Sequence, residues 1–371
     1  MEATRILLST RKGLIVFERG ASGWKLAAEH FSEARVSYAL EDPRNETLWV
    51  CLDHGHWGSK LHRSRDRGRS FEEVDAPAYP ADAQMRRAMG LGASGEVLRS
   101  ESPARLYRIW TIVPGSPAQP ERLYMGTEPG GLFISEDAGT SWSLCRALWD
   151  HPSRQEEWAG AGTDYPALHS IVIDPRDPDR MYVGISCAGV FETVDGGKSW
   201  VPRNKGISSA FLPNPTAEVG HDPHCLVQCR SRPDALWQQN HCGIFRSTDA
   251  GASWIEIADA GPAFGWGFAI AVDPGNAERV WVVPMDGSRT APGRALAVYR
   301  TDDGGRHWTA FRHGLPQEHC YDLVLRQGMD LAGERLVIGS STGNAWVSED
   351  GGESWACLGT HLPPIFAARF A

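Results

Sequence analysis

An eight-residue pattern that recurs along almost the whole chain limits what this sequence can fold into more than any other feature. Its clearest copy, residues 247–254, reads Ser-Thr-Asp-Ala-Gly-Ala-Ser-Trp. Near-copies that keep the Asp-x-Gly centre lie at 64–71, 135–142, 193–200, 301–308 and 348–355, and a degenerate one lies at 18–24. Because a fixed internal period indicates stacked copies of one supersecondary unit, we predict a single repeat domain over residues 1–371.

Each copy of the pattern predicts a β-hairpin. The Asp side chain can accept hydrogen bonds from the following backbone N–H groups, and Gly can adopt the positive φ that a tight turn needs. A flat Trp at the start of the return strand suits the gap between two packed sheets. Two more strand signals precede each hairpin, most clearly at 169–175 and 180–185, so each repeat is expected to hold four strands.

The copies resemble the Asp-box, or bacterial neuraminidase repeat. The chain is similar to the Asp-box β-propellers, which include sialidases, xyloglucanases, sortilin-type receptors and photosystem II assembly factors. The resemblance implies an all-β fold, a seven-bladed β-propeller of four-stranded antiparallel blades. The first repeat lacks its innermost strand, and residues 365–370 are expected to supply it, so that the C-terminal strand closes the ring and removes exposed edges. The predicted blades cover approximately 1–28 plus 363–371, 35–75, 105–145, 166–203, 222–257, 265–311 and 319–358.

The composition of the chain limits the classes of partner that it is expected to bind. A net charge of -9 argues against a nucleic-acid footprint, which needs a basic surface. No apolar run approaches the roughly 20 residues of a membrane helix, so no membrane partner is expected. No signal peptide is recognised after Met1, and the eight cysteines lack the dense spacing of a secreted disulfide scaffold, which favours a cytoplasmic protein. We expect a small-molecule or carbohydrate ligand; the sequence does not indicate an oligomeric state.

The long inserts are expected to decorate one face of the propeller. They lie at 76–104, 146–165, 204–221 and 284–294, and loops on a rigid scaffold commonly carry binding and catalysis. The first two are expected to form a lid of structureless loops. On the same face, the starts of the innermost strands and the neighbouring tips should ring the mouth of the central channel. Alignment of the repeats places these strand starts at Ser37, Arg108, His169, His224, Phe268, Tyr321 and Phe366.

Five histidines are predicted to meet at this mouth, namely His54, His56, His169, His224 and His241. Neutral imidazoles on different strands are how proteins build catalytic metal sites, so the set predicts one divalent transition metal, Zn, Mn, Cu or Fe. The alternative is that these rings only hydrogen-bond loop backbone around a wet channel.

Other side chains at the mouth are candidates for catalysis or substrate binding. The predicted catalytic residues are His169, His224, Tyr321, Glu128 and Asp286, because imidazole, phenol and carboxylate groups can move protons. Asp164 and Asp222 are further candidate carboxylates from the inserts. The predicted substrate-binding residues are Arg108, Arg289, Asn240, Trp57 and Ser37, where arginine would hold an anionic group and tryptophan would stack on a sugar.

The resemblances leave two functions open. Sialidases need an Arg-Ile-Pro type motif before the first repeat, and residues 34–37, Ala-Arg-Val-Ser, do not provide it, so sialidase activity is not expected. Seven-bladed polysaccharide lyases look similar in their histidine-rich mouths, and by that resemblance Tyr321 would act as base and Arg108 as charge neutraliser. The leading hypothesis is a metal-assisted hydrolase or lyase, or an oxidative enzyme, acting on a sugar-like ligand. The alternative is a non-catalytic binding or assembly propeller, which a mouth plugged by Phe268 and Phe366 would favour.

Overall fold

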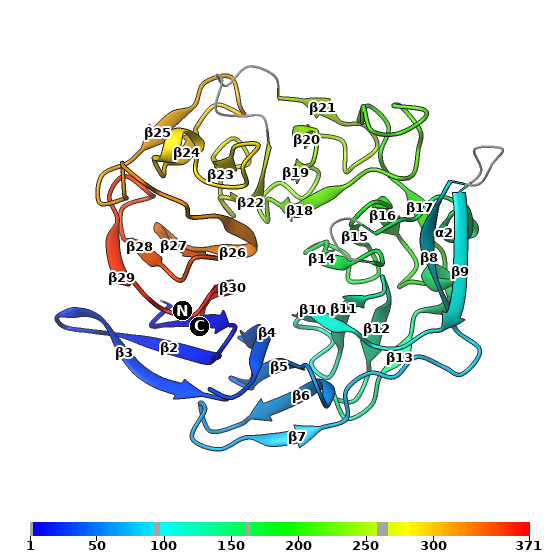
Figure 1. Ribbon diagram of the computed structural model, residues 1–371, viewed down its shortest axis with the longest axis horizontal. Coiled ribbons are helices and arrows are strands. Elements are labelled where there is room, and N and C mark those ends of the chain that lie inside the picture. The colour runs from blue at the N-terminus through cyan, green and yellow to red at the C-terminus, as the bar shows by residue number, and fades with distance from the viewer. Residues whose placement is uncertain (1–2, 92–96, 161–163, 258–265) are drawn as a thin grey trace.

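The chain forms a ring of β-sheets (Figure 1), and its inner strands line a central channel that holds a cavity of about 800 Å³. The computed structural model describes residues 3–91, 97–160, 164–257 and 266–371. In these ranges the sheets are five of four strands, one of eight strands that unites two blades, and one two-stranded hairpin. The expected all-β, seven-bladed propeller of antiparallel blades is therefore confirmed.

The five separate blades each run from an inner to an outer strand. The first holds β4 (Arg35–Glu41), β5 (Leu48–His54), β6 (Gly58–Ser64) and β7 (Glu72–Val74). The second holds β10 (Arg108–Pro114), β11 (Leu123–Glu128), β12 (Leu132–Ser135) and β13 (Ser143–Leu144). The third holds β14 (Leu168–Ile173), β15 (Met181–Ile185), β16 (Gly189–Thr193) and β17 (Val201–Pro202). The fourth holds β18 (Pro223–Gln228), β19 (Leu236–Asn240), β20 (Gly243–Ser247) and β21 (Ile255–Glu256). The fifth holds β22 (Trp266–Val272), β23 (Val280–Met285), β24 (Val298–Thr301) and β25 (Thr309–Phe311).

The eight-stranded sheet is where the ring closes. One half is β26 (Val324–Ala332), β27 (Arg335–Ser340), β28 (Ala345–Ser348) and β29 (Ala356–Gly359). The other half is β30 (Ile365–Phe370), β1 (Arg5–Thr10), β2 (Gly13–Gly20) and β3 (Gly23–His30), so both ends of the chain meet in one blade (Figure 1). The C-terminal strand pairs antiparallel with β1 and touches β26 through the bridge of Gln327 with Ala367. The predicted closure by the C-terminal strand is confirmed.

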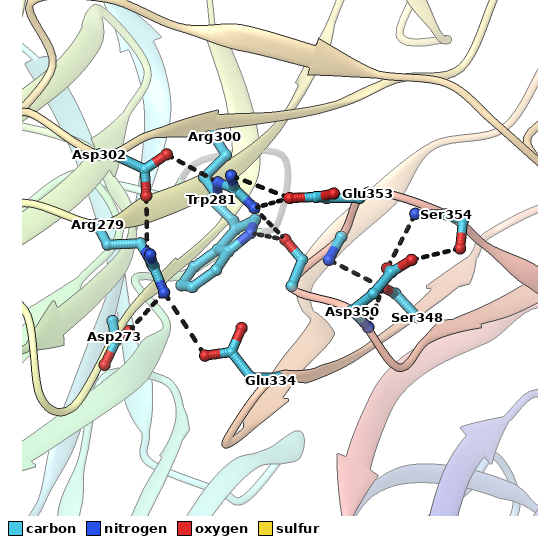
Figure 2. Close-up of polar contacts among 12 residues, drawn as sticks. Asp273, Arg279, Trp281, Arg300, Asp302, Glu334, Ser348, Asp350, Glu353 and Ser354 are labelled. Atoms are coloured by element: carbon cyan, nitrogen blue, oxygen red, sulfur yellow. Dashed lines mark hydrogen bonds and ion pairs between the residues drawn. The ribbon is translucent and has the colours of Figure 1, made fainter.

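The repeated pattern forms a hydrogen-bonded turn, shown for Asp350 in Figure 2. Asp350 Oδ1 accepts from Ser348 Oγ at 2.7 Å and from the Ser354 backbone N at 2.9 Å, while Oδ2 accepts from Ser354 Oγ. The two glycines that follow have φ of 71° and 88°, which explains their place in the pattern. The same carboxylate bonds recur at Asp66, Asp137, Asp195, Asp249 and Asp303.

These turns also join neighbouring blades. Trp281 is 1% exposed, and its Nε1 donates to the Gly351 carbonyl at 2.8 Å across the blade boundary (Figure 2). Arg300 Nη1 donates to the same carbonyl at 3.0 Å. Arg279 pairs with Asp302 of its own blade at 2.7 Å and reaches Glu334 of the next blade at 3.5 Å. Residues of one repeat turn thus form hydrogen bonds with side chains of the blade before it.

The inner strands carry irregularities where they approach the channel mouth. In six of them the pairing register skips one residue, which marks a β-bulge. The skipped residues are Ser37, Trp110, His169, His224, Phe268 and Phe366. In β26 the shift is larger and spans Val324 to Met329. Bulges re-aim side chains and are common beside active sites, so the fold itself varies the lining of the mouth.

The inserts hold more regular structure than the sequence predicts. The segment expected as a structureless lid contains a hairpin of β8 (Gln84–Leu91) and β9 (Val97–Pro103), followed later by α1 (Arg146–Trp149) and α2 (Pro152–Glu156). A 3-10 turn, η1, covers Pro292–Arg294. Arg86 Nη1 donates to the Gln155 carbonyl at 3.1 Å, and the hairpin stands beside α2 at the rim of the ring rather than over the channel (Figure 1). Within the described ranges, no helix has the length and apolar character needed to cross a membrane.

Candidate functional site

A pocket of about 400 Å³ opens at the channel mouth. Four inner strands, β10, β18, β22 and β26, and the loops beside them form its wall. Its lining comprises Arg108, Trp110, Ala167, Ser186, Cys187, Phe211, Asp222, His224, His241, Trp266, Phe268, Arg289, Leu323, Leu325 and Arg326. Arg326 also lines a larger cavity of about 800 Å³ in the rest of the channel. The pocket therefore lies on the face that the inserts decorate, as the sequence predicts for a site.

Three side chains converge in this pocket from one blade. Asp222 precedes β18, His224 lies in β18, and His241 follows β19. Asp222 Oδ2 lies 3.3 Å from His224 Nε2 and 3.8 Å from His241 Nδ1. One ligand atom from each residue lies within 4.8 Å of the other two. This is the one such group of three or more metal-ligating side chains among the described residues.

The backbone holds Asp222 in place. His221 is fully buried, and its ring nitrogens contact Ser209 Oγ at 2.7 Å and the Ala217 carbonyl at 2.6 Å, which anchors the end of the insert. The Cys187 N–H donates to Asp222 Oδ1 at 3.3 Å, and the Asp222 carbonyl accepts from the His241 N–H at 2.9 Å. Asp222 is 4% exposed, so this carboxylate is buried with a fixed direction.

The tautomer of His224 follows from its partners. Its Nδ1 lies 2.6 Å from the Gly267 carbonyl, which can only accept, so Nδ1 carries the proton. Burial lowers the pKa of His224, although the hydrogen bond to Asp222 opposes this, and a neutral ring leaves a lone pair on Nε2. Burial raises the pKa of Asp222, but nearby groups, the Arg326 guanidinium among them, outweigh it and the net pKa is lowered, so the carboxylate is ionised. Two acceptors thus face each other at 3.3 Å, an arrangement that a cation between them would stabilise.

The geometry fits a small divalent cation. Two nitrogen or oxygen ligands of a tetrahedral zinc lie roughly 3.4 Å apart, given bonds of about 2.0–2.1 Å. The separations of 3.3 and 3.8 Å from Asp222 are close to this value. Metal-bound histidines commonly donate their other N–H to a backbone carbonyl, as His224 does to Gly267. His241 has a side chain 42% exposed, so an incoming ligand could reach this point from the solvent side.

Aromatic rings surround the cluster. Phe268 lies against the His224 ring with centroids 4.4 Å apart, and Trp266 lies 4.8 Å from the His241 ring. Phe211, which is 45% exposed, meets the outer side of His241 at 5.5 Å. Phe268 is part of the wall, and Phe366 lies under the Arg35 guanidinium at 4.0 Å, so neither ring plugs the pocket.

The five-histidine centre predicted from the sequence is not formed. His169 is fully buried, and its ring nitrogens contact the Pro223 carbonyl at 2.8 Å and Ser170 Oγ at 2.9 Å. Burial lowers its pKa well below the ordinary value, so it is a neutral structural ring between β14 and β18. His54 Nδ1 accepts from the Trp57 N–H at 3.2 Å, and exposed His56 packs edge-on against the Trp57 ring. Only His224 and His241 of the predicted set come together, with Asp222 as the third member.

The other predicted catalytic residues lie outside the pocket lining. Tyr321 is 56% exposed, precedes β26 and lies under the Arg294 guanidinium at 4.8 Å. Glu128 is buried and accepts from Trp110 Nε1 at 3.3 Å. Asp286 shapes its own loop, because it accepts from the Ser288 N–H at 2.8 Å. Tyr321 lies outside this lining because β26 begins three residues after it.

The predicted binding residues divide into two groups. Arg108 and Arg289 line the pocket, and Arg108 Nε pairs with Asp53 Oδ2 at 3.4 Å. Asn240, Ser37 and Trp57 do not line it: Asn240 accepts from the Cys242 N–H at 3.1 Å, Ser37 Oγ donates to the Cys51 carbonyl at 3.2 Å, and Trp57 is 68% exposed on a tip.

Sequence reasoning missed several lining residues, among them Trp110 and Arg326. Trp110 is the bulged residue of β10, two positions beyond the one that strand alignment selects. Arg326 lies in the irregular part of β26, where Gly328 follows a charged residue inside an apolar strand. An interior glycine in a strand is a signal of a bulge and could have indicated this shift.

Comparisons with known proteins place the chain among β-propellers. No protein-family profile matches it. It is 27% identical over 276 residues to an oligoxyloglucan-reducing end-specific xyloglucanase of Emericella nidulans, a match that covers 66% of this chain and 30% of the relative. Among solved structures, the GH74 xyloglucanase from Xanthomonas campestris superposes with a TM-score of 0.67 at 18% identity, covering 97% of this chain and 53% of that one. YCF48 from Cyanidioschyzon merolae superposes with a TM-score of 0.54 at 14% identity, covering 93% and 88%. The matched part thus spans less than a third of the curated relative, and the structural likenesses concern the fold.

Proposed function

We propose that this chain is a carbohydrate-acting hydrolase whose site is the pocket at the channel mouth, with one divalent transition metal bound by Asp222, His224 and His241. The observation that carries the proposal is the convergence of three ligand atoms within 4.8 Å of one another in an aromatic-walled pocket. Indole rings offer flat faces for sugar rings, and Trp110 and Trp266 both line this pocket. Similarity to xyloglucanases supports a sugar as the ligand.

The chain's own groups define how such a site would work. The hydrogen bond to Gly267 fixes the His224 ring so that Nε2 faces Asp222, and the buried carboxylate stays ionised. His241 offers Nδ1 from the open side of the pocket. A metal held by these three groups would supply a bound water of lowered pKa as the nucleophile.

A two-carboxylate mechanism has less support from the geometry. Most glycoside hydrolases place a pair of Asp or Glu residues on either side of the scissile bond. Among the described residues that line the pocket, Asp222 is the only carboxylate. Asp53, just outside, is tied to Arg35 at 3.5 Å and Arg108 at 3.4 Å. Metal assistance is therefore favoured over an acid and base pair.

The test combines metal analysis with an activity assay. Full-length protein, purified without a His-tag, is reconstituted with Zn, Mn, Cu or Fe, analysed by ICP-MS and incubated with xyloglucan oligosaccharides. We expect about one metal per chain, and an affinity at least roughly tenfold lower in Asp222→Asn and His224→Gln. His56→Gln is the matched control, because this exposed histidine is outside the cluster, and it should keep both metal and release of reducing sugar.

Three outcomes decide between the alternatives. Absence of metal in the reconstituted wild type, with sugar release retained, would overturn the metal site and leave a hydrolase. Sugar binding without turnover under every metal would favour the non-catalytic binding propeller. Metal retained in His224→Gln but lost in His56→Gln would show that the metal binds outside the cluster of Asp222, His224 and His241, and would overturn the proposed site.

A cytoplasmic location is part of the proposal. All eight cysteines are unpaired, with Cys51, Cys225 and Cys229 among the buried ones. Unpaired thiols suit a reducing compartment. Fractionation of the native cell checks this, and recovery of the protein outside the cytoplasm would contradict it.

A further inference from the structure

Arg326 is a cation of the channel that makes no close ion pair among the described residues. It projects from the innermost strand β26 and lines the pocket, and among the described residues no carboxylate oxygen lies within 4.0 Å of it. In the part of the chain that the structure describes, its Nε has no hydrogen-bond partner, and its one side-chain hydrogen bond is a long one of 3.4 Å from Nη2 to Ser186 Oγ. Asp222 attracts this guanidinium electrostatically but forms no ion pair with it within 4.0 Å, and an enclosed guanidinium without a close counter-ion is costly.

Two aromatic rings fix the position of this guanidinium. Its central carbon lies 5.6 Å from the Trp110 ring centroid and 4.8 Å from that of Phe268. Aromatic faces attract cations, and the two rings come from different blades, so the side chain is held before a ligand arrives. Its Nε is buried and lacks a hydrogen-bond partner among the described residues.

The charge of the pocket contrasts with that of the chain. The chain as a whole carries a net charge of -9, whereas the charged residues that line this pocket are three arginines and one carboxylate. Arg108 is paired with Asp53, but exposed Arg289 makes no ion pair within 4.0 Å among the described residues. Because Arg108 is paired with Asp53, two cations, Arg289 and Arg326, face one carboxylate, Asp222, which leaves one positive charge in excess among the described lining residues.

We propose that the pocket binds an acidic saccharide, whose carboxylate is held by Arg326 with help from Arg289. This inference rests on the proposed carbohydrate function and specifies its substrate class. Arg326 and His224 both contact Phe268, with Arg326 Cζ 4.8 Å and the His224 ring 4.4 Å from the Phe268 ring, so the acidic group would lie beside the Asp222 cluster. A guanidinium can hold a planar carboxylate through two parallel N–H donors, and because the same fork also fits a phosphate, a sugar phosphate is one arm of the test.

Binding measurements on the full chain test the proposal. Isothermal titration at constant ionic strength compares methyl glucuronide, methyl glucoside, glucose 6-phosphate and acetate. We expect wild type to bind the glucuronide roughly tenfold more tightly than the neutral glucoside, since one charge-assisted pair contributes about that much. Arg326→Met keeps the apolar stem between the two rings and should abolish this preference, and Arg326→Lys should restore only part of it.

Two further variants separate a fold defect from a binding defect. Arg289→Met changes an exposed loop residue and should reduce the preference while leaving the melting temperature unchanged. Arg306→Met, on an exposed repeat turn outside the pocket lining, is the matched control and should bind as wild type does.

The outcomes also separate this inference from the proposed function. Equal binding of the charged and neutral glycosides would overturn the anion site while keeping a carbohydrate function. Tighter binding of glucose 6-phosphate than of the glucuronide would overturn the carboxylate assignment. Binding of acetate with the expected Arg326 dependence, but of no sugar, would overturn the carbohydrate function and the saccharide part of this proposal together. An unchanged preference in both Arg326→Met and Arg289→Met would assign the charge selection to other residues.

Discussion

Closure of the ring by β30 can be tested at one contact, between Ile365 and Gly339. Ile365 is fully buried among residues of two blades, including Leu8 of β1 and Val337 of β27. A Cβ added to Gly339 would lie 2.6 Å from Ile365 Cγ2, so this isoleucine packs directly on the β27 backbone. Truncation of Ile365 therefore removes side-chain atoms that pack in the seam, which is the contact between the last blade and the first.

The magnitude follows from burial and from limited relaxation. An Ile→Ala change in a core costs about 2–5 kcal/mol, and a cavity bounded by two sheets cannot collapse easily, so Ile365→Ala is expected to cost about 3 kcal/mol. Gly339→Ala alone should also destabilise, because its methyl group overlaps Ile365. In the double variant the new methyl group occupies the cavity, so the combined cost should fall below the sum of the two by about 1 kcal/mol or more.

The assay is urea unfolding followed by tryptophan fluorescence, with the two single variants, the double variant and Leu26→Ala as the control. Leu26 is 55% exposed on the outer strand β3, and its truncation should change the free energy of unfolding by no more than about 0.5 kcal/mol. Additive effects of Gly339→Ala and Ile365→Ala, or a cost for Ile365→Ala as small as that for Leu26→Ala, would refute the packing described for the seam.

Three further predictions concern the repeat turns and the thiols. In the turns of Asp66, Asp137 and Asp195, hydrogen bonds from the serine four residues later lower the pKa of the aspartate to about 2. The stabilising contribution of these aspartates is therefore complete above the unfolded pKa of about 4 and is lost as pH falls toward 2. Circular dichroism should show acid unfolding in this pH window, and a flat signal there would contradict the prediction. Trp281→Phe removes the donor to the Gly351 carbonyl while Arg300 still serves it, so urea unfolding should show a loss of about 1–2 kcal/mol, and wild-type stability would argue against this bond. Cys357 is exposed, whereas burial raises the pKa of the Cys187 thiol to about 12. A thiol reagent should therefore modify one thiol quickly, and this fast phase of modification should be absent in Cys357→Ser. A fast phase that survives in this variant would contradict the assignment.

Much of the channel lining could be aligned from the sequence, but its exact residues could not. Strand alignment places Ser37, His169, His224, Phe268 and Phe366 at equivalent positions, and each is the bulged residue of its inner strand. The same alignment selects Arg108 where Trp110 is the bulged residue, and Tyr321 where β26 begins later. Equivalent positions also differ in role: His169 is locked by two protein partners, while His224 keeps one nitrogen toward Asp222.

The sequence by itself determined the blades, because each turn is built within eight residues and its Asp, Ser and Gly requirements are visible in every copy. Residue Asp350, for example, satisfies its bonds entirely from Ser348 and Ser354. Only the tertiary structure decided the site. Asp222, at the end of an insert, meets His224 and His241, and Arg326 reaches the same pocket from another blade about a hundred residues later. Those meetings depend on bulges, on strand register and on closure of the ring, which together involve several blades, so no single local pattern in the chain fixes them.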